Sequence, residues 1–173
     1  MRSIQSVADF ELTWAQQSAF KNSFEFHFGG ELVATLQFPK MRATVAIAET
    51  GDGAWKFERT GFWKSKILIT STNSADALGS YTSNPWKGGG ILELPDGRKF
   101  ITWRSFWSGR FEFRTEAGET LFQIQSHGAF RLKASVRINR RAVHVPELPW
   151  MIPFAFYLGV LARNDAAGAA AAG

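Results

Sequence analysis

The chain has 173 residues, of which 45% are hydrophobic, 14% aromatic and 20% charged, a composition typical of one folded domain and not of a disordered segment. It contains no cysteine, which excludes disulfides and thiolate zinc sites and favours a reducing compartment such as the cytoplasm. The net charge of +5 makes anionic partners the first to consider, whether an acidic membrane surface, a phosphoinositide or a nucleic acid. The first residues carry no apolar run, so we expect no secretory signal.

Short runs of alternating hydrophobic and polar residues recur from about Phe10 to Ile138. In "FEFHF", for example, Phe24, Phe26 and Phe28 fall on one side of the chain, which is typical of a half-buried strand. The runs are separated by short turn sequences such as "ETGDG", "PDG" and "EAGE", which favour antiparallel neighbours over crossover helices. The pattern predicts ten to twelve strands in an all-β barrel or sandwich.

An internal similarity appears when the sequence is shifted by 67 residues, which superposes residues 49–70 on 116–137 without a gap. The identical positions are Glu49, Gly51, Gly61 and Lys66, which match Glu116, Gly118, Gly128 and Lys133. This match predicts a duplication, although chance similarity between two hairpins is the alternative. We therefore expect two half-barrel repeats, at about 20–71 and 90–138, joined by a polar linker at 72–89.

The longest uncharged stretch runs from Leu148 to Ala162. As a helix its 15 residues would measure about 22 Å, against about 30 Å of hydrocarbon in a bilayer, so it is too short to span comfortably. Inside a soluble protein, a helix that is apolar on all sides must be surrounded by that protein, and a closed sheet of about twelve strands has room for one. We predict a central helix at about 149–164. Burial in a membrane is the alternative, because the Ala-rich tail at 166–173 could extend the apolar length.

Duplicated strands followed by an apolar helix ending in "YLGVLARNDAA" resemble the tubby C-terminal-like superfamily, which includes the tubby domain, phospholipid scramblases and the LURP-one-related proteins. The resemblance covers about Phe10 to Ala166 and is greatest to the small bacterial members. It implies a single domain over 1–173, built as a twelve-stranded antiparallel closed barrel around the helix. Tubby domains bind phosphoinositides through basic residues on the barrel surface, whereas no stretch of this chain resembles the acidic calcium segment of scramblases.

Basic residues gather in "AFRLKASVRINRR", where inward-facing Val136 and Ile138 leave the Lys and Arg side chains on the outer face. With the equivalent residues of the first repeat, the candidate lipid-headgroup-binding residues are Lys64, Lys66, Arg131, Lys133, Arg137, Arg140 and Arg141. Clustered Lys and Arg bind phosphate groups, and Arg does so with two parallel hydrogen bonds. The alternative is that these residues only keep strand edges soluble.

The aromatic run "FITWRSFWSGRF" has two interpretations. With its arginines it could stack the bases of a single-stranded nucleic acid. We favour instead a structural role, as barrel core and rim, for Phe100, Trp103, Phe106 and Trp107, so a nucleic-acid partner is not expected. The glycines of "WKGGG" lack the spacing of a phosphate-binding loop and are interpreted as a linker.

No catalytic motif stands out in the sequence. His27, His127 and His144 lack metal-ligand spacing, and there is no nucleophile elbow or HExxH sequence. We therefore expect no enzyme activity, metal or cofactor. The leading hypothesis is a tubby-like domain that binds anionic phospholipid or phosphoinositide headgroups at the membrane periphery. The alternative is a protein-interaction scaffold without a lipid ligand. A lipocalin-like carrier is disfavoured, because a barrel filled by its own helix would have no cavity.

Overall fold

The computed structural model describes residues 1–7, 11–16, 23–39, 44–61, 66–84, 88–105, 109–127 and 133–171. Two short 3-10 helices, η1 (Ile4–Val7) and η3 (Arg140–His144), precede and follow the strands. The strands are β1 (Glu11–Gln16), β2 (Ser23–Phe28), β3 (Glu31–Gln37), β4 (Val45–Thr50), β5 (Gly53–Thr60), β6 (Lys66–Ser71), β7 (Ala77–Asn84), β8 (Gly89–Glu93), β9 (Lys99–Ser105), β10 (Arg110–Thr115), β11 (Thr120–His127) and β12 (Lys133–Ile138). One long helix, α1 (Leu148–Ala171), completes the described chain.

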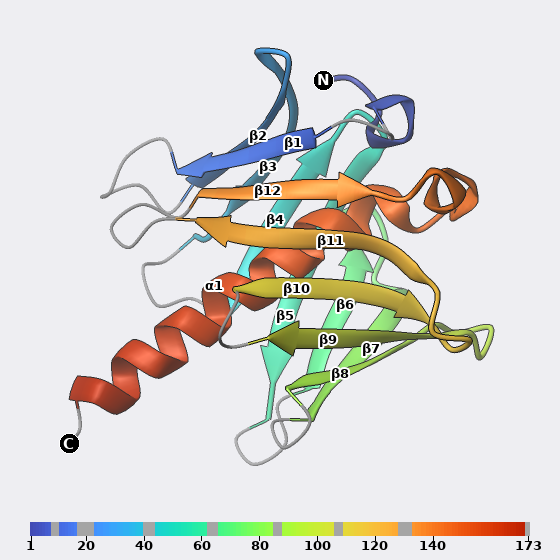
Figure 1. Ribbon diagram of the computed structural model, residues 1–173. Coiled ribbons are helices and arrows are strands. Elements are labelled where there is room, and N and C mark those ends of the chain that lie inside the picture. The colour runs from blue at the N-terminus through green and yellow to red at the C-terminus, as the bar shows by residue number, and fades with distance from the viewer. Residues whose placement is uncertain are drawn as a thin grey trace.

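The twelve described strands form a closed antiparallel barrel in which each strand pairs with its neighbours in sequence (Figure 1). The ring is closed between the first strand and the last, where Trp14 of β1 lies opposite Ala134 of β12. Closure removes the two open edges that a sheet of this size would otherwise present to solvent or to another chain. The prediction of an all-β closed barrel is confirmed.

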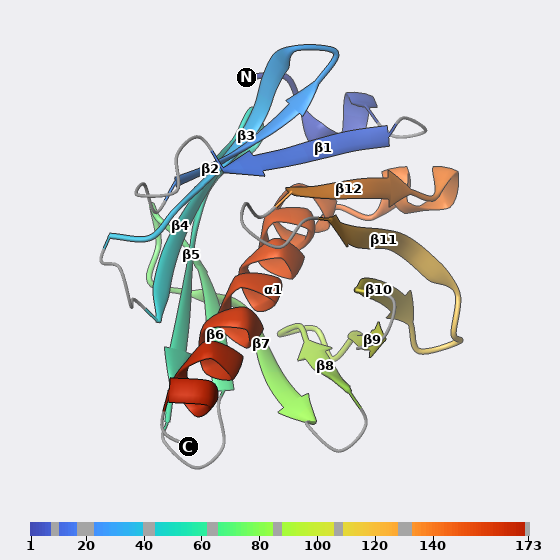
Figure 2. The same ribbon diagram turned by 60° about the vertical axis from the view of Figure 1, so that its left-hand side comes forward.

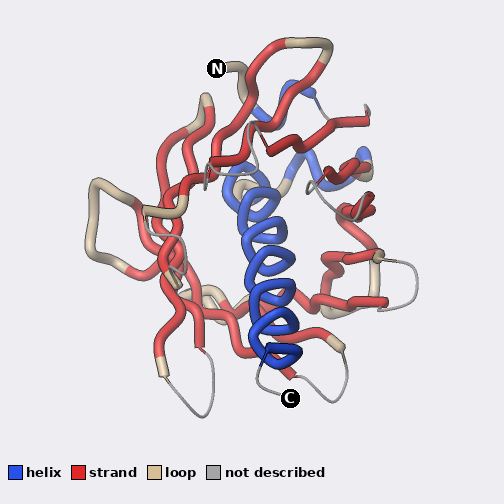
Figure 3. The backbone as a smooth tube through the Cα atoms, turned by 90° about the vertical axis from the view of Figure 1, so that its left-hand side faces the viewer, coloured by secondary structure: helices blue, strands red, loops and turns tan. Residues whose placement is uncertain are grey.

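Helix α1 runs through the barrel, with strands on all sides of its first half (Figures 2 and 3). From Leu148 to Leu161 its side chains are buried, and from Arg163 onward they are exposed. The predicted central helix is confirmed, but it extends through the Ala-rich segment to Ala171 instead of ending near residue 164. Among the described helices, none has the length and apolar character needed to cross a membrane.

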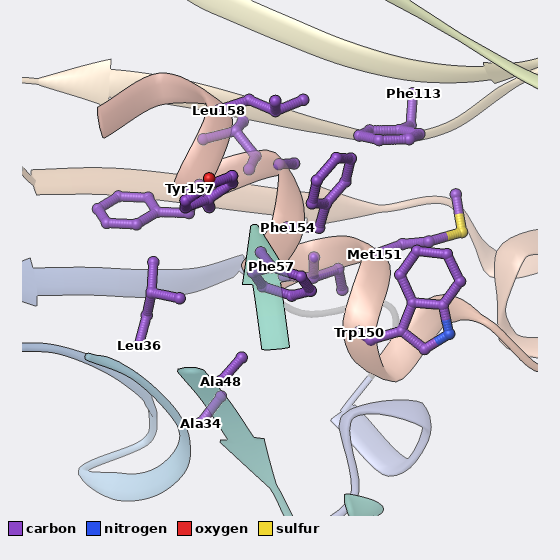
Figure 4. Close-up of a cluster of buried hydrophobic side chains, with 14 of the residues drawn as sticks. Ala34, Leu36, Ala48, Phe57, Phe113, Trp150, Met151, Phe154, Tyr157 and Leu158 are labelled. Carbon is purple, nitrogen blue, oxygen red and sulfur yellow. The ribbon is translucent and has the colours of Figure 1, made fainter. Parts of the chain in front are cut away.

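The barrel core is organised around aromatic side chains of α1 (Figure 4). Phe154 is fully buried, and its ring centroid lies 5.2 Å from that of Phe57 and 5.6 Å from that of Tyr81. On β4, next to the strand that carries Phe57, small buried residues such as Ala48 let the helix approach β3, β4 and β5 closely. Tyr157 donates a hydrogen bond of 2.5 Å to the carbonyl oxygen of Thr44, and burial raises the pKa of its hydroxyl. The helix is therefore packed against one side of the barrel interior.

The structural equivalence of the two halves is more extensive than the sequence similarity. A shift of 67 residues carries β5 onto β11 and β6 onto β12 with the same bounds, and β1 lies at the position equivalent to β7. The halves are therefore β1–β6 and β7–β12. The prediction of a linker at 72–89 is wrong for β7, which pairs with both β6 and β8. Gly79 is at an inward-facing position of β7, and leucines of the neighbouring segment, Leu92 and Leu94, fill the space beside it. Because β7 has a glycine where other strands have an apolar side chain, its sequence lacks the alternation that identifies those strands.

Strands β8 and β9 approach each other at Gly89, where the backbone leaves no room for a side chain. A Cβ atom built there would overlap the carbonyl oxygen of Thr102, a backbone atom that cannot move without distorting β9. We therefore expect Gly89→Ala to lower the free energy of unfolding by about 2 kcal/mol or more, as overpacking does. Urea denaturation measures this loss. The control is Gly168→Ala, where a Cβ meets nothing within 4 Å and a helical alanine is favourable. Equal stability of the two variants would contradict the expectation.

Candidate functional site

Three large hydrophobic side chains are exposed together on the outer wall of β8 and β9. The exposed fractions are 47% for Ile91, 39% for Ile101 and 38% for Trp103. Among the described residues, the only other large hydrophobic residue with comparable exposure is Met1, near the start of the chain. We call Ile91, Ile101 and Trp103 the outer patch.

Strand register makes the outer patch continuous. Ile91 lies directly opposite Ile101 across the β8–β9 pair, and Trp103 follows two residues later on the same face of β9. Across from Trp103 stands Gly89, which has no side chain to cover the indole ring. The patch is therefore a contiguous apolar surface, the kind that marks an interaction site on a folded protein.

Arginine side chains border the patch on β10. The Arg114 guanidinium lies 5.5 Å from the centroid of the Trp103 ring, in a cation–π contact. Arg114 also donates hydrogen bonds of 2.9 and 2.5 Å to one carboxylate oxygen of Glu112, whose other oxygen is 3.6 Å from Arg110. The Glu112 side chain is only 8% exposed, whereas both arginines reach solvent. Seen from outside, this border therefore presents two cations above one covered anion.

Basic residues also lie at one end of the patch and further round the ring. Lys99, on β9, lies 3.9 Å from Glu93 in an ion pair that is open to solvent. Further round the ring, Lys66 lies opposite Thr82, which in turn lies opposite Ile91, so an outward row connects Lys66 with the patch. Exposed pairs such as Lys99 with Glu93 contribute little to stability, about 0–1 kcal/mol. Their cations therefore remain available to an anionic surface.

The structure does not bring the predicted headgroup residues together on one surface. Lys66 is exposed on β6, Arg137 is exposed on β12, Arg140 and Arg141 are exposed in η3, Lys133 begins β12, and Lys64 and Arg131 lie outside the described residues. In the ring, β6 and β12 are six positions apart out of twelve, which is the largest separation possible. Lys66 and the residues of β12 therefore lie on opposite walls, so the described members of the predicted set do not share one surface.

The part of the predicted set on β12 and η3 is close to acidic residues. Arg141 donates a hydrogen bond of 2.8 Å to Glu119, although its side chain is 80% exposed. The backbone of Asn139 caps η3, and its side chain accepts a hydrogen bond from the Arg141 amide. Arg137 faces Gln123 across the β11–β12 pair. Strand β12, with Arg137, lies three strands from β9 and so a quarter of the ring away, whereas Arg141 reaches Glu119 in the turn between β10 and β11.

Sequence reasoning assigned Trp103 to the core and rim of the barrel, and this assignment is wrong. Phe100 and Thr102 of β9 are buried and point inward, so the alternation of the strand turns Ile101 and Trp103 outward. The alternation of inward and outward side chains along β9 is the sequence signal that identifies the outer patch. The interpretation of Phe106 and Trp107 concerns residues outside the described part of the chain.

Side chains that could bind a metal do not cluster in the described part of the structure. Over the residues that the structure describes, no group of three or more His, Cys, Asp or Glu side chains could hold an ion. His27 instead lies 2.9 Å from Glu25 on the same strand.

Comparison with known proteins bears on the fold and not on the site. No family model matches the sequence, and no curated protein matches it. The fold is similar to that of a protein from Arabidopsis thaliana whose X-ray structure superposes with a TM-score of 0.55, over 91% of this chain and 93% of that chain. The sequences are 14% identical, so this likeness shows a shared fold alone. The resemblance to the tubby C-terminal-like superfamily stays a prediction.

Proposed function

We propose that this chain is a non-enzymatic binding domain that associates peripherally with anionic membrane surfaces through the outer patch and its cationic border. The observation that carries the proposal is the exposure of Trp103 and Ile101 beside Arg114. Trp is enriched at membrane–water interfaces because one part of its ring is apolar and its N–H is polar. Arginine beside it provides attraction to acidic headgroups.

The energetic argument combines two modest contributions. Transfer of apolar side-chain area out of water contributes about 25 cal/mol per Å², and each Lys or Arg near an anionic leaflet contributes about 1 kcal/mol. Neither contribution alone anchors a protein stably, whereas two together do, as for lipidated proteins with a basic patch. Arg110, Arg114 and Lys99 border the patch, and both nearby acids, Glu93 and Glu112, are paired with them.

Vesicle co-sedimentation tests the proposal. We expect binding to phosphatidylserine-containing vesicles at low salt, loss of that binding at high salt, and no binding to neutral phosphatidylcholine vesicles, because charge screening removes the attraction. Replacing Ile101 and Trp103 by Ser is expected to weaken binding by at least about tenfold, equivalent to about 1.4 kcal/mol. These residues are exposed, so the fold should persist.

The matched control reverses charge on β12, with Arg137→Glu. This variant should bind nearly as well as the unaltered protein, since Arg137 lies a quarter of the ring from the patch. Loss of binding in the control alone would move the lipid site to β12. Absence of binding to both vesicle types would refute the lipid proposal and favour a protein-interaction scaffold, for which an exposed apolar patch is also typical.

A further inference from the structure

A pocket lies inside the barrel between α1 and the strands β6–β10, near the end from which the helix emerges. Its volume is about 270 Å³, and its apolar lining includes Ile67 of β6, Phe111 of β10, and Leu158 and Leu161 of α1. This volume is close to the lower limit for small-molecule pockets, which is about 300 Å³. The expectation that a barrel filled by its own helix has no cavity is therefore wrong at this end.

The helix side of the pocket includes small residues as well as leucines. Gly159 and Ala162 line the pocket, and a Cβ atom built on Gly159 would have no atom within 4 Å. A glycine within a helix is unfavourable relative to alanine. Its presence beside open space therefore favours a role for that space.

The charged side chains of the lining are engaged by the protein itself. Arg59 of β5 donates hydrogen bonds of 2.8 and 3.2 Å to the carboxylate of Asp165 on α1, and both residues line the pocket. Arg104 of β9 also has an interaction within the protein. An ionised ligand would lose its hydration in the pocket, where the charges of the described lining already have partners, and this loss is unfavourable. The lining therefore favours a neutral ligand.

Tyr81 provides a hydrogen-bond acceptor in the pocket wall. It is only 4% exposed, and its hydroxyl oxygen lies 2.9 Å from that of Thr102. Thr102 donates its one hydroxyl proton to the carbonyl oxygen of Gly90, at 3.3 Å. The proton between the two hydroxyls therefore comes from Tyr81, whose oxygen can still accept a hydrogen bond. Burial raises the pKa of this hydroxyl, so it keeps its proton at neutral pH.

The glycine at residue 90 makes this position of the tyrosine possible. Gly90 is buried on β8, and a Cβ atom built there would overlap the hydroxyl oxygen and Cζ of Tyr81. Because residue 90 has no side chain, the phenol lies against β8 and reaches Thr102 on β9. The acceptor is therefore held in place by close packing against a strand of the closed barrel.

We propose that this pocket binds a small neutral alcohol with an apolar chain. The alcohol hydroxyl donates a hydrogen bond to the Tyr81 oxygen, and the chain lies against the apolar side chains of α1, β6 and β10. The volume equals that of about nine water molecules at about 30 Å³ each, which suits a ligand of about nine non-hydrogen atoms. 1-Octanol has that size and chemistry.

This site is separate from the outer patch. The pocket lies inside the barrel, whereas Ile91, Ile101 and Trp103 are exposed on its outer wall. The variant with Ser at residues 101 and 103, expected to lose vesicle binding, should therefore bind 1-octanol as the unaltered protein does. Failure of either proposal leaves the other unaffected.

Isothermal titration calorimetry with four probes of similar size, in the absence of vesicles, tests the proposal. We expect 1-octanol to bind, and its isomer heptyl methyl ether, which has no O–H donor, to bind about fivefold more weakly, the effect of one neutral hydrogen bond. Octanoate and octylamine, both ionised at neutral pH, should bind more weakly than either. No heat of binding from millimolar 1-octanol, equal affinity for alcohol and ether, or tighter binding of octanoate would overturn the proposal.

The two tyrosines of the chain provide a matched pair of variants. Tyr81→Phe removes the acceptor and keeps the ring, so it should lower the affinity for 1-octanol about fivefold and leave that for the ether nearly unchanged. Tyr157→Phe makes the same change at a hydroxyl that donates to the carbonyl oxygen of Thr44, and should keep the preference for the alcohol. An undiminished preference for the alcohol in Tyr81→Phe would refute the assigned acceptor.

Two glycine substitutions on α1 test the position of the apolar chain. Gly159→Leu places a side chain in the pocket and should abolish 1-octanol binding, while leucine favours the helix. Gly168→Leu lies on the exposed part of α1, where a Cβ also meets nothing within 4 Å, and should bind 1-octanol as the unaltered chain does. Binding of 1-octanol by a folded Gly159→Leu variant would show that the ligand lies elsewhere. If that variant fails to fold, the comparison of Tyr81→Phe with Tyr157→Phe decides.

Discussion

A chain that ends after Pro146 is expected to have no cooperative unfolding transition, because it lacks the whole of α1. Thirteen residues of this helix are buried, from Leu148 to Leu161. Burying one large apolar side chain contributes about 1.5–3 kcal/mol, whereas a domain is stable by only about 5–15 kcal/mol in total. The empty barrel would also expose the inward faces of its strands to water.

Near-ultraviolet circular dichroism and thermal denaturation measure this result. The matched control ends after Asp165, which keeps the buried part of α1 and the hydrogen bonds between Asp165 and Arg59. It removes only residues beyond the barrel, which are exposed where the structure describes them, so we expect its transition to stay within a few degrees of that of the full chain. A folded chain ending at Pro146 would show that α1 is dispensable, and would reopen the alternative that the segment belongs in a membrane.

Phe154→Ala is expected to cost about 3–5 kcal/mol of unfolding free energy, the range for a fully buried Phe. The Phe154 ring contacts aromatic rings from three strands and from its own helix, including those of Phe57, Tyr81, Phe113 and Tyr157. Its removal leaves a cavity at the centre of these rings that their strands, fixed in a closed barrel, cannot collapse to fill (Figure 4). Urea denaturation gives the loss as a lower midpoint with an unchanged slope.

Two further variants provide comparisons for the stability loss of Phe154→Ala. Phe154→Leu keeps most of the apolar volume and should lose clearly less than the alanine variant. Ile101→Ala shortens a side chain that is 39% exposed and should change the unfolding free energy by no more than about 0.5 kcal/mol. Similar losses for Phe154→Ala and Ile101→Ala would mean that the interior around α1 is loosely packed.

The sequence carried enough information to predict the barrel and its central helix, because both follow from local patterns. Alternation identifies a strand such as β2 from its own residues, and an uncharged run with no polar face identifies a buried helix. Strand β7 escaped this reasoning, since its inward Gly79 is covered by leucines of another segment. A strand whose core side is filled by its neighbours has no periodic signal of its own.

The candidate site was predicted less well, because it depends on register and closure. The outer patch joins Ile91 and Ile101 from two strands, and which residues face each other is decided by the turn between them. The separation of Lys66 from Arg137 follows from the places of β6 and β12 in a ring of twelve strands, a property of the closed assembly and of no single strand. The pocket between α1 and the strands β6–β10, lined by Ile67, Phe111 and Leu158, likewise depends on how the helix packs inside the closed barrel, which no local sequence pattern determines.

Closure between β1 and β12 has a consequence for how the molecule is made. Glu11 and Arg137, paired in the finished barrel, are separated by nearly the whole strand region, and the helix that fills the interior is synthesised after both. A nascent chain that has completed its first six strands still has two open edges and lacks the helix around which the core forms. Contacts between distant residues form slowly, and unpaired edges aggregate. We therefore expect folding to be a late, all-or-none event that begins only after α1 has left the ribosome.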